Sequence, residues 1–447
     1  MGAPTDRVVA KLQALVRIPT VSDRDPALVD TAAFDRQLVE LADQFPRLHD
    51  QLELTRVGTH GLLFRWPGSS DDRPVVLMAH LDVVPVDESA PWQHPPFDGE
   101  IHDSPTGAAI WGRGTLDDKG CVVAICEAVE LLLEDGFTPA QDVWLSFGCD
   151  EEVSGTAAVE AVAELLGRGV TPWFVLDEGG AIAHQAFPGV EPPLGVIGIT
   201  EKGTTSVELI AEGRGGHAST PARNGPTVRI AKAVLRVEKS PFPATAPAPT
   251  LELLRRLAPH LPRPVRSIAA RSDRITPLVT RALVAAGPEA AAMTRTTVAV
   301  TTLSGSPALN VIASSARAGL NIRIMVGDTV AGVLAHLRKA IKDDDIRIEL
   351  VDEGEPSPVS PMDEAFELLE DCIVQVFPDA VPTPYVMMAA TDSRHFTRIS
   401  ERVYRFAPFR MTKAQRQAIH SYDEHLGITD LIEGVTWYRT LIERLPR

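Results

Sequence analysis

The stretch Val75-Val-Leu-Met-Ala-His80-Leu-Asp82 decides the fold, because a run of apolar residues leads directly into a His and an Asp. An unbroken apolar run of this length predicts a strand buried on both faces, as in parallel sheets. Similar runs at 143–147 and 173–176 alternate with helical patterns at 121–133 and 157–166. The alternation predicts an α/β fold, with a mainly parallel sheet between two layers of helices.

Segments that carry a His or a carboxylate recur along the chain. They are His80-Leu81-Asp82, Asp117-Asp118-Lys119, Asp150-Glu151-Glu152, Asp177-Glu178-Gly179-Gly180 and the late His420. Ligands bind at the carboxyl ends of parallel strands, and three of these segments directly follow a predicted strand. An oxygen-rich set with two imidazoles and no thiolate is what two adjacent divalent cations require if they share a bridging carboxylate and a bridging water. The pattern predicts a two-metal hydrolase.

Each segment also has an ordinary structural interpretation. A His and an Asp two residues apart at a strand end are a weak signal alone, although their spacing lets Asp82 hold the imidazole of His80 while its other nitrogen takes a metal. The acids at 117 and 118 could cap the helix that starts near Cys121. Three consecutive acids at 150–152 could begin a solvated helix. Cys149 is better explained as a small core residue than as a ligand.

Composition limits the class of protein. The chain has 447 residues, of which 44% are apolar, so it is long enough for two packed domains. Its net charge of −17 repels nucleic acid and anionic membrane surfaces, and an anionic substrate must therefore meet locally placed Arg or His. The four cysteines form no close pair, and neither an export signal nor a membrane span is evident. We expect a cytoplasmic protein without a nucleic-acid partner.

The order of predicted strands and helices changes in the middle of the chain. Residues 1–202 and 354–447 predict two parts of one catalytic domain, and 203–353 predicts a smaller inserted lid domain. The order strand, helix, strand, strand, helix, strand in this insert is typical of a ferredoxin-like α+β module. The Pro- and Ala-rich stretch 240–295 is too long for a structureless loop, so we expect a helical excursion there. Residues 354–361 have the composition of a linker back to the first domain.

Ordered motifs along the chain resemble those of the co-catalytic zinc peptidases that include aminoacylase, carboxypeptidase S and succinyl-diaminopimelate desuccinylase. The resemblance extends from about Val8 to the C-terminus. It is carried by His80-Leu-Asp82, Gly112-Arg-Gly-Thr-Leu-Asp117-Asp-Lys, Asp150-Glu-Glu-Val-Ser-Gly, Val175-Leu-Asp177-Glu-Gly-Gly, Gly215-Gly-His217-Ala-Ser, Asn310-Val-Ile and Thr391-Asp-Ser-Arg394. The stretch 91–97, the long lid insertion and 177–180 look like the carboxypeptidase S branch, which contains the mammalian N-fatty-acyl amino acid hydrolases.

This resemblance implies roles for the metal-site residues. His80 and Glu152 would each belong to one metal half, Asp117 would bridge the ions, and His420 would close the second half. Glu151 would be the general base. The remaining ligand is Asp177 in some relatives and Glu178 in others, and we favour Asp177. The implied metals are two Zn ions, with Co or Mn able to substitute.

The resemblance also assigns the lid residues. His217 matches a donor to the developing oxyanion, which often comes from the partner subunit of a dimer, so a homodimer through the lid domain is implied. Asn310 and Arg323 match a pair that grips the free carboxylate of the substrate, for which the planar guanidinium is suited. Asp392 and Arg394 would shape the pocket, although an Asp-Arg pair at a turn is as often structural. The implied substrate is a small N-acyl amino acid or a short peptide with a free carboxylate.

Other functions remain open at this point. A dipeptidase or aminopeptidase would use the same metal site. A non-catalytic binding protein of the same fold would have lost ligands, whereas every ligand position here is filled. A hydrolase that uses a nucleophile without metal would need an elbow such as Gly-x-Ser-x-Gly, and the sequence contains none.

Overall fold

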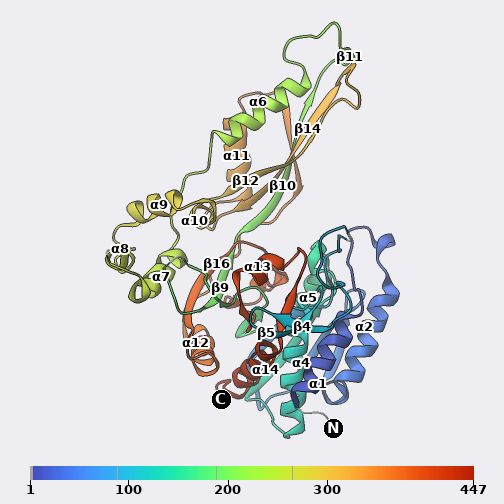
Figure 1. Cartoon of the computed structure of the whole chain (residues 1–447), viewed down its shortest axis with the longest axis vertical. Coiled ribbons are helices and arrows are strands. Elements are labelled where there is room, and N and C mark those ends of the chain that lie inside the picture. The colour runs from blue at the N-terminus through green and yellow to red at the C-terminus, as the bar shows by residue number, and fades with distance from the viewer. Residues whose placement is uncertain (1–3, 88, 188, 264) are drawn as a thin grey trace.

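The computed structural model describes residues 4–87, 89–187, 189–263 and 265–447. It has a broad body that holds both chain ends and an elongated body formed by the middle of the chain (Figure 1). The long insert therefore projects away from the rest of the protein.

A ten-stranded sheet forms the centre of the broad body. Its strands are, in pairing order, β1 (Glu53–Val57), β2 (Gly61–Trp66), β6 (Gln141–Gly148), β3 (Ser70–His80), β7 (Phe174–Asp177), β17 (Val403–Arg405), β9 (Leu194–Glu201), β8 (Ala181–Ala183) and β18 (Arg410–Met411), with β16 (Val381–Met387) also paired to β9. The four central strands, β6, β3, β7 and β17, pair in parallel. The predicted α/β class with a mainly parallel central sheet is confirmed.

The apolar run of β3 is buried on both faces of this sheet. Val75, Leu77 and Ala79 belong to one hydrophobic cluster, and Val76 and Met78 belong to another. The first cluster includes helices α1 (Pro4–Val16), α3 (Pro46–Gln51), α4 (Lys119–Glu134), α12 (Glu364–Val376) and α14 (Ile428–Glu443), and the second includes α5 (Ala157–Gly167). The period of two along the strand thus explains why the run shows no polar alternation.

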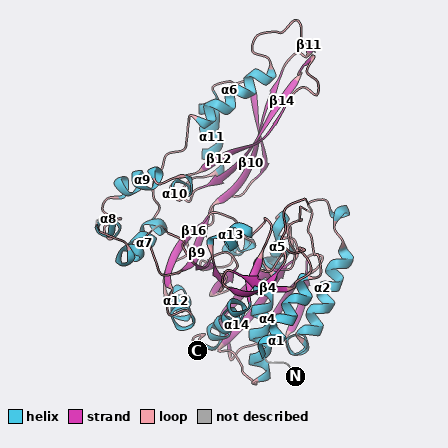
Figure 2. Ribbon diagram, in the orientation of Figure 1, coloured by secondary structure: helices cyan, strands magenta, loops and turns pink. Residues whose placement is uncertain are grey.

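The elongated body is built on a four-stranded antiparallel sheet with the order β12 (Thr297–Ser304), β14 (Ser315–Ile324), β10 (Gly203–Glu212) and β15 (Ile346–Asp352). Helices α6 (Pro226–Glu238) and α11 (Val330–Ile341) share its hydrophobic cluster. Figure 2 shows both helices on the same side of these strands. The chain order of the elements is the one that the sequence predicts for the lid, whereas the domain limits at 202 and 353 stay predictions.

The stretch 240–295 contains short helices, as expected. They are α7 (Ala248–Leu257), α8 (Val265–Ala269), α9 (Thr276–Ala285) and α10 (Pro288–Ala292). The excursion packs against the broad body, since Leu253 and Leu257 of α7 share a cluster with Leu194 of β9 and Val381 of β16. It is therefore anchored at the base of the lid.

Further strands and helices complete the two bodies. They are β4 (Ile101–Ser104), β5 (Gly107–Trp111) and β19 (His425–Gly427) in a three-stranded sheet, β11 (Gly216–His217) and β13 (Val311–Ile312) in a two-stranded sheet, and helices α2 (Thr31–Gln44) and α13 (Lys413–Ala418). The small sheet of β11 lies at the far tip of the lid (Figure 1). Among the helices of the described ranges, none has the length and apolar character needed to cross a bilayer.

Candidate active site

Side chains from distant parts of the chain form two overlapping groups of potential metal ligands. His80, Asp117 and Glu178 make one group, and Asp117, Glu152 and His420 make the other, with the ligand atoms of each group within 4.8 Å of one another. His80 ends β3, Asp117 precedes α4, and Glu178 directly follows β7. The carboxyl ends of neighbouring parallel strands thus supply the site, as the sequence predicts.

Asp117 belongs to both groups because its two oxygens face different ways. Oδ1 lies 3.0 Å from Nε2 of His80, and Oδ2 lies 2.9 Å from Nε2 of His420. The same nitrogen of His420 lies 3.0 Å from Oε2 of Glu152. A carboxylate that presents one oxygen to each of two sites has the geometry of a bridging ligand. The donors are carboxylate oxygens and imidazole nitrogens, which suits two divalent cations such as zinc.

The electrostatics of this cluster favour bound cations. Burial opposes a charge on His80, but hydrogen bonds with Asp117 and Asp82 raise its pKa well above the usual value. Hydrogen bonds with Asp117 and Glu152 raise the pKa of His420 to about 10. Burial, together with the nearby carboxylates of Asp117 and other acids, raises the pKa of Glu178 well above its usual range. Divalent cations would replace these protons and neutralise the crowded carboxylates.

The structure favours Glu178 over our first choice, Asp177, as the remaining ligand. Asp177 is the last residue of β7, and its Oδ2 accepts a hydrogen bond of 2.9 Å from the backbone N–H of Ser393. Its carboxylate therefore binds the backbone at Ser393 and contributes to neither of the two ligand groups. Glu178 is the next residue, and its side chain joins the group of His80 and Asp117.

The acids before α4 do not act as a helix cap. Asp118 occupies the N-cap position, but its side chain accepts no capping hydrogen bond. It is buried, and its Oδ2 accepts a bond of 3.3 Å from the backbone N–H of His80. The peptide bond between Asp117 and Asp118 is cis.

Asp82 positions several parts of the site. Its Oδ1 lies 3.4 Å from Nδ1 of His80, on the side of the ring opposite the nitrogen that faces Asp117. Its two oxygens also accept hydrogen bonds from the backbone N–H groups of Glu151 and Glu152, at 3.2 and 3.1 Å. One buried carboxylate thus holds the imidazole and fixes the start of the segment that carries both acids.

Sequence reasoning missed a buried ion pair beside the site. Arg113 donates to Oε2 of Glu424 at 2.6 Å and to the backbone oxygen of Ser421 at 2.6 Å. Oε1 of Glu424 accepts from the backbone N–H groups of Leu116 and Asp117, at 2.8 and 3.2 Å. Arg113 lies within a quoted motif, whereas Glu424 belongs to no motif that could have marked it.

Comparison with known proteins identifies the family of the chain. The model of Peptidase family M20/M25/M40 matches residues 76–444. The chain belongs to this family. It is 36% identical to the probable carboxypeptidase S-like 2 of Dictyostelium discoideum over 90% of this chain and 78% of that protein. It is 34% identical to the human (Homo sapiens) N-fatty-acyl-amino acid synthase/hydrolase PM20D1 over 95% of this chain and 85% of that protein. The carboxypeptidase S branch suggested by the motifs is confirmed.

A solved structure shows the same fold at low sequence identity. The M20 family metallo-carboxypeptidase of Sulfolobus solfataricus superimposes with a TM-score of 0.71 and 15% identity, covering 98% of each chain. The family match and the two curated relatives show that the chain is a hydrolase of the M20 metallopeptidase family.

The lid residues of this M20 family member do not gather at the ligand groups. His217 and Asn310 lie together at the lid tip, where the N–H of Ala218 donates to the oxygen of Asn310 at 3.1 Å. Arg323 lies near the other end of β14, a strand of 10 residues. With a rise of about 3.4 Å per residue, the two ends of this strand are ~30 Å apart. The expected pair of Asn310 and Arg323 therefore does not form within one chain.

Asp392 and Arg394 lie close to the metal-site strands. Their side chains are 4.0 Å apart, and burial raises the pKa of Asp392 to about 7, although Arg394 opposes this shift. A side-chain carbon added at Gly148 would lie 3.0 Å from Oδ2 of Asp392, so this carboxylate rests against the end of β6. The pair thus shapes the packing around the site.

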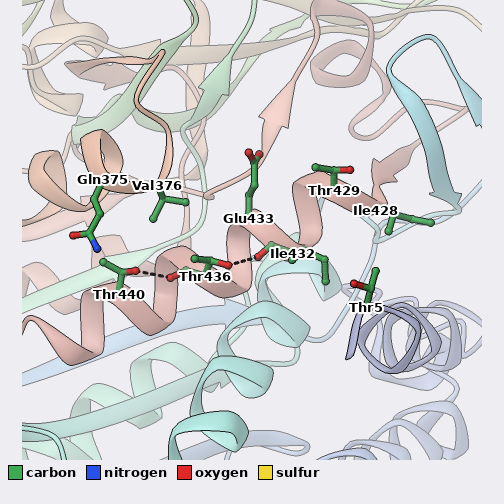
Figure 3. Close-up of a pocket in the computed structure, with 9 residues that line it drawn as sticks. All are labelled: Thr5, Gln375, Val376, Ile428, Thr429, Ile432, Glu433, Thr436 and Thr440. Atoms are coloured by element: carbon green, nitrogen blue, oxygen red, sulfur yellow. Dashed lines mark hydrogen bonds between the residues drawn. The ribbon is translucent and has the colours of Figure 1, made fainter. Parts of the chain in front are cut away.

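A groove elsewhere on the surface is not the active site. It encloses about 470 Å³ along α14 and is lined by residues such as Thr5, Val376, Ile428 and Ile432. None of the potential metal ligands contributes to it (Figure 3).

The choice between Asp177 and Glu178 can be tested by metal content. We expect two zinc ions per chain, about 3.5 to 4 Å apart as in other two-metal sites. Glu178→Gln should lower the bound zinc toward one ion per chain, whereas the matched variant Asp177→Asn should keep two. Mass spectrometry of the elements in dialysed protein measures both. The reverse result would return the ligand role to Asp177.

Proposed function

We propose that the chain is a metal-dependent hydrolase that cleaves the amide bond of N-acyl amino acids or short peptides with a free carboxylate. The observation that carries the proposal is Asp117, whose two oxygens face the imidazoles of two ligand groups. His80, Asp117 and Glu178 would hold one Zn, and Asp117, Glu152 and His420 the other, with Co or Mn able to replace it. The name of the human relative, which refers to N-fatty-acyl amino acids, supports this substrate class.

The proposed reaction needs no covalent intermediate. Two divalent cations at this site would polarise the scissile carbonyl and acidify the attacking water. Glu151 then accepts the proton of that water and returns it to the leaving nitrogen. Its backbone is fixed by Asp82, and its carboxylate lies among the charges of His80, Asp392 and Glu152. This placement supports the proposal that Glu151 is the general base.

The two adjacent acids should give different phenotypes when altered. Glu151→Gln should keep both metals and lower kcat by about 10² to 10⁴, the usual share of general base catalysis. Glu152→Gln should instead lose metal, because its oxygen lies 3.0 Å from Nε2 of His420. Steady-state kinetics and metal analysis of the two variants, prepared side by side, test this assignment. Reversed phenotypes would exchange the two roles.

The carboxylate of the substrate would bind Arg323. This side chain is half-buried at the base of the lid and donates to Oγ1 of Thr204 at 2.7 Å. Among the described residues its other guanidinium N–H groups have no acceptor, so they are available to a ligand. In the proposal, an anion held here would orient the neighbouring amide toward the catalytic residues. An aminopeptidase, the alternative within the same family, would instead bind a free amino group.

Removing the charge of the substrate tests the carboxylate clamp. Replacing an N-acyl amino acid by its amide should lower kcat/KM by about 10²-fold or more, because the guanidinium would be left unpaired. Arg323→Ala should damage hydrolysis of the acid far more than that of the amide. Equal rates for acid and amide in the unaltered enzyme would reject the clamp and favour an aminopeptidase or a general amidase.

In this proposal, residues at the tip of the lid complete the active site of a second copy of the chain. His217 is exposed, and Leu303, Leu309 and Val311 nearby expose 66%, 105% and 45% of their surface. Exposed apolar residues in one region mark a surface that binds a partner. We propose a homodimer through the lid, in which His217 and Asn310 of the partner subunit complete each site as oxyanion donor and carboxylate contact.

Mixing two inactive variants tests the dimer. His217→Ala and Glu151→Gln should each be nearly inactive alone. If His217 acts in trans, a mixture that exchanges subunits should recover activity, because one site of each mixed dimer has an intact Glu151 and an intact donor from its partner. Light scattering gives the oligomeric state in parallel. A monomer, or a mixture without recovery, would contradict the proposal. A cytoplasmic location stays a prediction.

A further inference from the structure

Lys202 lies where the chain passes from the central sheet into the lid, between β9 and β10. Its backbone N–H donates to the oxygen of Met387 at 2.9 Å. A side-chain carbon added at Gly179 would lie 3.0 Å from the methyl group of Met387, and Gly179 directly follows the proposed ligand Glu178. A single side chain therefore separates the backbone of Lys202 from the segment that carries a metal ligand.

Three cations gather at this base of the lid. The ammonium of Lys202 donates to the backbone oxygen of Arg295 at 2.8 Å. Thr204, two residues further, is the register partner of Arg323 and accepts a hydrogen bond from it. Burial, followed by the charges of Arg323 and Arg295, lowers the pKa of Lys202 to about 8. The charges of Arg323 and Arg295 thus act on the buried ammonium of Lys202.

No carboxylate of the described residues forms an ion pair with this cluster. Over the described ranges, no ion pair within 4.0 Å involves Lys202, Arg295 or Arg323. The neighbouring Glu201 is paired with Arg405 at 3.1 Å, and Asp328, whose charge raises the pKa of Lys202, is exposed. In a chain with a net charge of −17, three cations without a paired acid are an unusual local excess.

The other deeply buried lysines of this chain have better partners. Lys11 is paired with Glu127 at 2.6 Å, and Lys119 donates to the oxygens of Leu15 and Ile18 at 2.9 and 2.6 Å. Lys202 is only 1% exposed and has one backbone acceptor. An ammonium group carries three hydrogen-bond donors. Burying it with a single acceptor therefore costs free energy unless an anion binds nearby.

We propose that the substrate's carboxylate receptor consists of Arg323 and Lys202 together, with Lys202 as a second positive charge behind the guanidinium. The inference rests on the proposed function and deepens it. Arg323 contacts the carboxylate, and Lys202 acts through its charge, so it is a specificity residue that does not touch the reacting atoms. The ligand class is the α-carboxylate of an N-acyl amino acid.

Lys202→Met tests the proposal, because methionine has a similar length and tolerates burial. With N-octanoylleucine the variant should lose about 10-fold or more in kcat/KM, mainly through KM, because a buried positive charge near the carboxylate stabilises the bound anion electrostatically. With N-octanoylleucinamide it should change less than about 2-fold. The matched control is Lys11→Met, which removes another buried lysine far from the receptor and should leave the acid-to-amide ratio unchanged.

Combining Lys202→Met with Arg323→Ala tests whether the two residues act on the same carboxylate. In the Arg323→Ala variant, Lys202→Met should add little further loss on the acid, because both charges act on the same carboxylate. Equal losses on acid and amide would make Lys202 merely structural, and fully additive losses would separate it from Arg323. Either result overturns the proposal, as does an unchanged ratio.

A binding measurement separates this inference from the proposed function. In the metal-loaded Glu151→Gln protein, calorimetry should show tighter binding of N-octanoylleucine than of its amide, and adding Lys202→Met should reduce that preference about 10-fold. If the unaltered enzyme hydrolyses neither compound, the proposed function fails, yet the calorimetry still decides whether Lys202 serves an anion receptor. Equal binding of acid and amide would reject the receptor.

Discussion

The active site depends on one carboxylate that must face two imidazoles at once. Asp117 meets this demand only because His80 and His420 approach it from opposite sides, at 3.0 and 2.9 Å. These residues lie far apart in the chain, so the sheet, the loop before α4 and the late His420 segment must all be correctly placed. This requirement explains why His80, Glu152 and Glu178 sit where parallel strands end, since the strands fix the relative positions of these three candidate ligands.

The buried ion pair of Arg113 and Glu424 holds the backbone of Asp117 in place. Glu424 accepts from the backbone of Asp117, and Arg113 donates to the backbone at Ser421, next to His420. The proposed bridging ligand Asp117 and the segment that carries His420 are thereby tied to one ion pair. Such a pair contributes little net stability after desolvation, but losing one partner would leave an uncompensated buried charge. Its value therefore lies in fixing the geometry of two ligands.

Much of this could be predicted from sequence because the signals are local. A strand that ends in a His or an acid marks both a fold element and a site, and His80, Asp117, Glu152 and His420 come together in the structure. The choice between Asp177 and Glu178 was not accessible in this way. Neighbouring residues at a strand end point in different directions, and which one faces the site depends on the turn through Gly179 and Gly180, whose φ values are 101° and 31°.

The positions of residues along the lid are a second feature that local sequence patterns do not predict. The element order of the lid could be read from periodicity. The family resemblance implies a pair of Asn310 and Arg323, whereas Asn310 lies at the lid tip and Arg323 lies near the opposite end of β14. No local signal reports this separation, because it depends on how far the antiparallel sheet extends from the broad body. The partners of Lys202 were equally hidden, since Arg295 and Arg323 reach it only through folding.

The two ends of the lid are held differently, and this difference determines what each can do. At the base, Ser357 donates to Glu201, which is also paired with Arg405, and Thr200 donates to the oxygen of Ser357. These buried contacts keep Lys202 and Arg323 in a fixed relation to the strands that carry the ligands. The tip has exposed apolar residues and no comparable contact with the broad body in the described structure. The proposed receptor at the base would therefore be preformed, whereas the proposed donor at the tip would be placed only by the second copy of the chain in the proposed homodimer.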